Sequence, residues 1–98
     1  MEAKKFLKKL GFERATFGLV LQSIRIRDDL TQVEMAKILG ISKAKLCGLE
    51  KGRRNVSLLK AVEYAKALGD STDYFLKVVI EDNLHEAGLK RKVELKSA

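Results

Sequence analysis

Residues Thr31 to Glu50 read TQVEMAKILGISKAKLCGLE, and they carry the clearest helix start and stop signals of the chain. Thr31 and Glu34 can form a capping box, which predicts that a helix begins directly after Thr31. Gly40 can take the positive φ that ends a helix, and Ser42 can cap the next one. The stretch therefore predicts two short helices joined by a tight turn.

The two predicted helices each have an inward and an outward face. Leu46 and Leu49 are spaced by three and face inward in the second helix. The outward residues of that helix are Lys43, Ala44, Lys45, Cys47 and Gly48. Two short helices with a glycine between them are typical of a helix-turn-helix, whose second helix enters the major groove of DNA. The alternative is an ordinary hairpin of a small helical bundle, which shows the same caps and spacing.

The chain resembles the Cro/C1-type repressor family, also called the XRE family, from about Phe17 to Leu76. The resemblance is carried by several motifs in fixed order: Thr31-Gln32, Met35-Ala36, Leu39-Gly40-Ile41-Ser42, Leu46, Leu49-Glu50-Lys51-Gly52-Arg53-Arg54-Asn55, Ser57 and Ala67-Leu68-Gly69. It implies an all-α, five-helix, lambda-repressor-like DNA-binding domain and a sequence-specific transcriptional repressor. Val56 stands where the family usually has proline, which affects the local loop geometry.

The resemblance also assigns roles to residues. It places base-reading contacts to double-stranded DNA on Lys43, Ala44, Lys45, Cys47 and Gly48, and it pairs Arg25 with Glu50. The phosphate contacts expected are Gln32, Ser42, Lys51, Arg53, Arg54 and Asn55. Cys47 and Gly48 are short, so DNA shape can supply part of the specificity, or Gly48 can simply allow close approach to the groove. Each basic residue, taken singly, could instead be a solvated surface charge.

Charge is concentrated where these contacts are expected. The 98 residues carry a formal net charge of +7. Residues 31–60 hold seven basic and two acidic side chains, whereas residues 61–98 hold six and seven. Neutralisation of DNA phosphates would use the positive middle of the chain. The C-terminal third is close enough to neutral to serve a protein partner.

Three further helices are expected around the central pair. Phe17, Val20, Leu21 and Ile24 form an amphipathic stripe at helical spacing, which predicts a helix that begins at Ala15 or Thr16. Ser57 caps a helix that ends at Gly69, and we expect its core residues to be Leu58, Leu59, Val62, Ala65 and Leu68. Ser71 or Thr72 begins the last helix.

The last helix has more apolar residues than a terminal helix needs, which favours a partner contact. The expected contact residues are Tyr74, Phe75, Val78 and Val79, and a homodimer on a two-fold repeated operator is the preferred explanation. The alternative is that Tyr74, Phe75 and Val78 close the core of the monomer.

The C-terminal tail changes its pattern after Gly88. Leu89, Val93 and Leu95 alternate with charged residues, as in an exposed strand that pairs with a second copy or another protein. The alternative is a disordered basic tail. This ending resembles that of HigA-type antitoxins, which implies an autoregulating antitoxin of a type II toxin-antitoxin pair with a RelE/HigB-like ribonuclease toxin as partner. A stand-alone repressor without a toxin is the alternative.

We expect three parts: a basic N-terminal segment over 1–14, the DNA-binding domain over 15–80, and an extension for dimer or partner contact over 81–98. The first segment could touch DNA phosphates, pack at an interface, or form a frayed terminal turn.

Catalysis is not expected, because the sequence shows no nucleophile and base pair and no phosphate-binding loop. Cys47 is the only cysteine and His85 the only histidine, so neither a disulfide nor a metal site is expected, and no cofactor is implied. No signal peptide or membrane-spanning run is apparent, which favours a cytoplasmic location without membrane contact.

Overall fold

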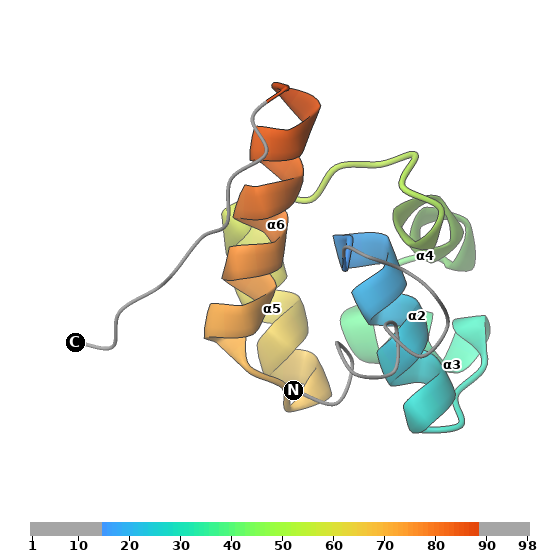
Figure 1. Ribbon diagram of the computed structural model, residues 1–98. Coiled ribbons are helices and arrows are strands. Elements are labelled where there is room, and N and C mark those ends of the chain that lie inside the picture. The colour runs from blue at the N-terminus through green and yellow to red at the C-terminus, as the bar shows by residue number, and fades with distance from the viewer. Residues whose placement is uncertain (1–14, 89–98) are drawn as a thin grey trace. The chain divides into compact units, whose positions relative to one another are not determined.

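The computed structural model describes residues 15–88, and every regular element within that range is a helix (Figure 1). The five helices are α2 Phe17–Arg27, α3 Gln32–Leu39, α4 Lys43–Glu50, α5 Leu58–Leu68 and α6 Thr72–Glu86. The all-α, five-helix expectation is confirmed. The predicted basic segment over 1–14 and the predicted strand with Leu89, Val93 and Leu95 lie outside the described residues.

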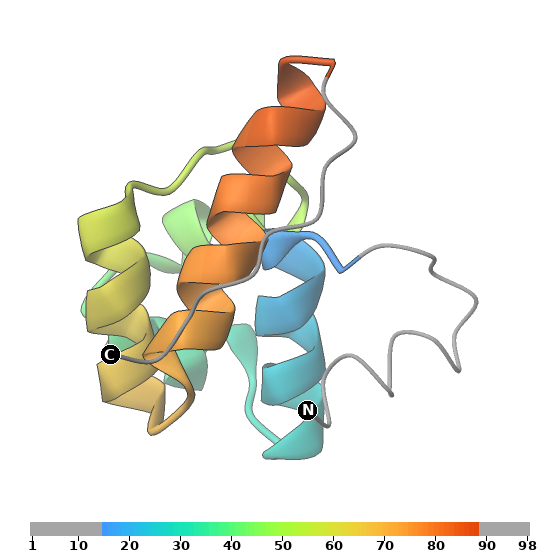
Figure 2. The ribbon, with the colours of Figure 1, turned by 60° about the vertical axis from the view of Figure 1, so that its left-hand side comes forward.

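The chain divides into two compact units, Met1–Asn55 and Val56–Ala98. In the first unit, α4 packs against both α2 and α3. Its buried apolar residues are Phe17, Val20, Leu21, Ile24, Met35, Ala36, Leu39, Leu46 and Leu49. In the second unit, α5 and α6 lie side by side (Figure 2). The first unit therefore contains the whole of the predicted helix-turn-helix.

Each of the five helices begins where a short hydroxyl side chain predicts it. The side-chain oxygen accepts a hydrogen bond from the backbone N–H three residues later, at 3.0 to 3.2 Å. The five caps are Thr16, Thr31, Ser42, Ser57 and Ser71. Thr31 and Glu34 complete the predicted capping box.

The first four helices end in one kind of turn. After α3 and α5, the residues with positive φ are Gly40 and Gly69, and after α4 it is Gly52. After α2 it is Asp29, with φ 55°. In each turn an N–H group donates back to a carbonyl five residues earlier, for example Ile41 to Ala36 at 3.0 Å. This is the Schellman arrangement, which satisfies carbonyls that the helix leaves unpaired.

The predicted core face of α5 was wrong at its first turn. Leu58 is 46% exposed and Leu59 is 69% exposed, whereas Ala61, Tyr64 and Ala65 are buried. Apolar residues occupy eight of the eleven positions of α5, on nearly every side of the helix. The spacing therefore fitted more than one face, and the sequence pattern could not select between them.

The apolar residues of α6 divide between core and surface. Phe75, Val78 and Val79 are buried within the chain and leave no surface for a partner. Tyr74 is only half-buried, yet its hydroxyl is buried without a hydrogen-bond partner among the described residues. Phe75, Val78 and Val79 therefore lie in the core. For Phe75 and Val78, this agrees with the alternative interpretation, in which they close the core of the monomer.

Candidate nucleic-acid interface

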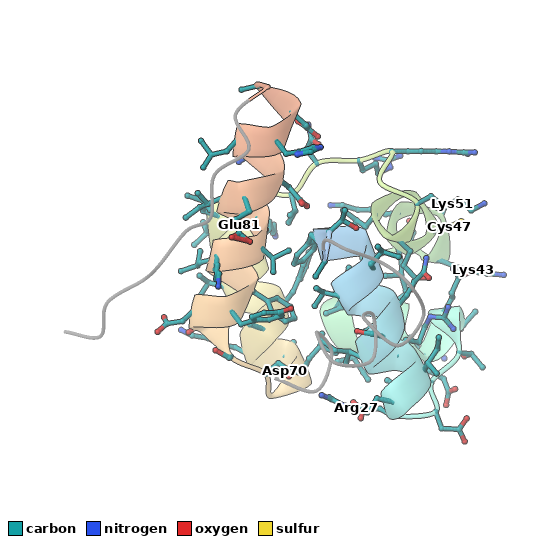
Figure 3. The ribbon with its side chains drawn as sticks, viewed as in Figure 1. Arg27, Lys43, Cys47, Lys51, Asp70 and Glu81 are labelled. Carbon is teal, nitrogen blue, oxygen red and sulfur yellow. The ribbon has the colours of Figure 1, made fainter. Side chains whose placement is uncertain are left out.

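Helix α4 is anchored on one side and open on the other. Leu46, Leu49 and Glu50 are buried. Ser42, Lys43 and Ala44 are exposed, while Lys45, Cys47 and Gly48 are half-buried. Figure 3 shows Lys43, Cys47 and Lys51 following one another along the outer side of the helix. The residues predicted to read bases therefore lie on the side of α4 that its packing leaves open.

The C-terminal end of α4 is held by a buried carboxylate. Arg25 on α2 donates to Glu50 from Nε at 2.9 Å and from Nη2 at 3.2 Å. The side chain of Glu50 is 2% exposed and that of Arg25 is 22% exposed. The same guanidinium also donates to the Leu30 carbonyl, at 3.4 Å. The pair expected from the resemblance is therefore brought together, and it ties the end of α4 to α2.

Gln32 has a structural contact in addition to its predicted one. Its Nε2 donates to Oε1 of Glu50 at 3.1 Å, and this hydrogen bond links the start of α3 to the end of α4. Gln32 is also the first residue of α3, where the helix N-terminus favours an anion. Phosphate binding by Gln32 remains a prediction. The hydrogen bond to Glu50, at the end of α4, already orients the Gln32 side chain.

Gly18 is a site residue that the sequence pattern did not reveal. A β-carbon built at Gly18 would collide with the backbone oxygens of Leu49 and Glu50. Beside it, Gln22 on α2 donates from Nε2 to the Glu50 carbonyl at 3.3 Å. The backbones of α2 and α4 therefore touch at Gly18. A glycine inside a helix, where it costs about 1 kcal/mol relative to alanine, was the available signal.

The loop after α4 carries the other basic residues among the predicted DNA contacts. Gly52 takes φ 74°, and the Arg53 N–H donates to the Gly48 carbonyl at 2.8 Å. All four predicted phosphate-contacting residues of this loop are exposed: Lys51, Arg53, Arg54 and Asn55. These residues belong to the same unit as α4 and follow directly after its last residue.

Two carboxylates near the helix pair are held in their charged form. The backbone N–H of Thr31 donates to Glu34, which lowers the pKa of that carboxyl. The Arg27 side chain likewise lowers the pKa of Asp28. Both carboxylates therefore stay ionised at neutral pH, and Glu34 adds negative charge at the N-terminus of α3.

Within residues 15–88, no group of three or more His, Cys, Asp and Glu side chains is placed to hold a metal ion. In the same range, no helix combines the length and the apolar character that crossing a membrane requires.

The order of the helices and the outward lysines of α4 fit a helix-turn-helix, the fold of a class of DNA-binding proteins. The helix-turn-helix family HTH_3 matches residues 21–75, and the chain belongs to that family. No curated protein matches the chain.

A solved structure that the chain resembles is an HTH_3 family transcriptional regulator from Vibrio cholerae. The TM-score is 0.52 and the sequence identity is 27%. The match covers 56% of this chain and 31% of that one, so the matched part of this chain spans about a third of the other protein.

Proposed function

We propose that this protein is a sequence-specific transcriptional repressor that inserts α4 into the major groove of its operator. The observation that supports this most is the anchoring of α4. Its buried side is held by Leu46, Leu49 and the Arg25 to Glu50 pair, while Lys43 and Ala44 face outward. A short helix held in this way can enter a groove without losing its own packing.

Base reading and phosphate binding divide between the helix and its loop. Lysine can donate to guanine O6 and N7, and the alanine methyl can contact a thymine methyl. The exposed cations of the loop suit phosphate, which sets register without reading sequence. We therefore assign Lys43, Ala44 and Lys45 to bases, and Lys51 and Arg53 to phosphates.

This division is tested by two alanine variants measured on operator and scrambled duplexes at several salt concentrations. Lys43→Ala with Lys45→Ala should weaken operator binding more than scrambled binding. Arg53→Ala should weaken both alike and reduce the slope of log K against log salt by about one. An unchanged slope in Arg53→Ala would contradict the phosphate assignment.

We further propose that the repressor acts as a homodimer on a two-fold repeated operator and is the autoregulating antitoxin of a type II pair with a RelE/HigB-like toxin. This proposal is supported by the resemblance of the C-terminal tail, which lies outside the described residues. The alternative is a stand-alone repressor. Purification of the full chain from its native host decides between them, since a stably bound basic protein of toxin size supports the antitoxin role.

A truncation separates the tail from the DNA-binding unit. Deletion of residues 89–98 should leave α4 intact and abolish rescue of cells from the toxin or dimer formation in solution. Full rescue and an unchanged oligomeric state in the truncated protein would remove both roles from the tail.

A further inference from the structure

The outward face of α4 has a gap at Gly48 that another side chain fills. Gly48 follows Ala44 by four residues and Lys45 by three, so the three positions share one face of the helix. A β-carbon built at Gly48 would lie 3.0 Å from Cδ of Arg54 and 3.1 Å from its Cγ and Nε. The Arg54 side chain therefore occupies the space that any larger residue at Gly48 would need.

The turn after α4 explains this placement. The Gly52 N–H donates to the Leu49 carbonyl at 3.1 Å, and the Arg53 N–H donates to the Gly48 carbonyl at 2.8 Å. These two hydrogen bonds form a Schellman turn, which reverses the chain at the end of the helix. Arg54 follows directly and lies back along the last turn of α4.

We infer that Arg54 is a specificity-determining residue that reads a guanine from the surface of α4, in place of the side chain that Gly48 lacks. The inference rests on the proposed DNA-reading function, and it moves Arg54 from the predicted phosphate contacts to the base contacts. The expected ligand of Arg54 is the major-groove edge of a G·C pair, where guanine O6 and N7 match the planar fork of the guanidinium.

Two observations support this assignment over a phosphate contact. Arg54 is exposed, and its guanidinium has no hydrogen bond or ion pair with any other residue in 15–88. Of its neighbours on the open side of α4, Ala44 and Cys47 are too short to donate a pair of hydrogen bonds to a base, and Lys45 offers a single ammonium group rather than a planar fork. Arg54 is thus the planar two-donor group that this part of the helix otherwise lacks.

The test uses the full chain and a duplex that it selects from a random pool of about 30 base pairs, which leaves room for two half-sites. Arg54→Lys keeps the charge but loses the planar fork. We expect it to weaken binding to the selected duplex roughly tenfold and to leave a scrambled duplex almost unaffected. Arg27→Lys is the matched control, an exposed arginine of α2 outside the proposed DNA contacts, and should change neither.

A second variant tests the link between Arg54 and Gly48. Gly48→Ala should not harm folding, since alanine is the better helix former and the obstructing atoms belong to a flexible side chain. It should nevertheless weaken binding to the selected duplex, because the new methyl group displaces Arg54. In the Arg54→Ala background the same change should have no further effect.

The outcomes separate the inference from the function on which it rests. If the wild-type chain selects no sequence, DNA reading fails and the inference fails with it. If selection succeeds but Arg54→Lys binds the selected duplex as wild type does, only the inference is overturned. Equal weakening by Gly48→Ala with and without Arg54 would also overturn it, since the methyl group would then obstruct DNA directly.

Discussion

The two units of this protein are stabilised by different kinds of contact. In the helix-turn-helix unit, a buried carboxylate, a bidentate arginine and a direct backbone contact fix where α4 ends. In the α5–α6 unit, described by itself, the buried residues are apolar apart from the hydroxyls of Tyr64 and Tyr74, and the Tyr74 hydroxyl has no hydrogen-bond partner among residues 15–88. Polar and backbone contacts tolerate few alternative geometries, whereas apolar packing tolerates many. The stricter contacts are found in the unit whose helix we propose to enter the DNA groove.

The largest effect is expected at Gly18. Gly18→Ala places a methyl group against two backbone oxygens, which cannot rotate away as a side chain can. We expect a loss of about 3 kcal/mol in the free energy of unfolding, measured by urea denaturation. Gly48→Ala is the matched control, a helical glycine facing only a side chain, and should cost nothing. Equal stability of the two variants would mean that α2 and α4 do not touch as described.

The next effect tests the ion pair. Arg25→Met leaves the buried Glu50 carboxylate with Gln32 as its remaining side-chain donor, and should cost about 3 kcal/mol of unfolding free energy. Arg27→Met removes an exposed pair with Asp28 and should cost less than about 0.5 kcal/mol. If the two methionine variants unfold at the same urea concentration, the Arg25 pair does not specify the geometry of the first unit.

In the second unit, the conservative change Tyr74→Phe should stabilise the folded state. Tyr74→Phe removes a buried hydroxyl that lacks a hydrogen-bond partner among residues 15–88, and should raise the unfolding free energy by about 1 kcal/mol. Thermal unfolding of the variant beside wild type measures this. A lower melting temperature would show that the hydroxyl has a partner after all.

The same tyrosine predicts a smaller effect of pH. Burial, and secondarily the nearby Glu81 charge, raise the pKa of Tyr74, and burial also raises the pKa of Tyr64. A raised pKa in the folded state gives stability that is fully present below the unfolded pKa of about 10 and is lost as the pH rises through the folded value. Stability should therefore fall above about pH 10, and less steeply in Tyr74→Phe. Parallel pH profiles would contradict this.

The smallest effect is expected at the first turn of α5. Leu59→Ser should change the unfolding free energy by less than about 0.5 kcal/mol, because the side chain is already mostly exposed. Val78→Ser, at a buried position of α6, is the comparison and should destabilise strongly. A large loss in Leu59→Ser would restore the core assignment that the structure overturned.

How far the sequence could predict this structure depends on the range of each contact. Caps such as Ser42 and stops such as Gly40 were predictable because their hydrogen bonds join residues a few positions apart. The inward face of α4 was predictable because only Leu46 and Leu49 are large and apolar. The face of α5 was not, since its apolar residues surround the helix.

The longer-range contacts of the site needed other information. The pairing of Arg25 with Glu50 came from the family resemblance, because 25 residues separate them and no local pattern links them. The contact of Gly18 with α4 depends on how two helices cross. The position of Arg54 depends on the turn at Gly52, whose local chemistry alone does not show which side chain will lie over Gly48.

Selection of duplexes from a random pool, with the full chain at moderate salt, shows whether the open face of α4 reads DNA. We expect a single enriched sequence with two related half-sites, and loss of its enrichment when Lys43 and Lys45 are both replaced by alanine. Recovery of unrelated sequences, or the same enrichment by the double variant, would contradict it.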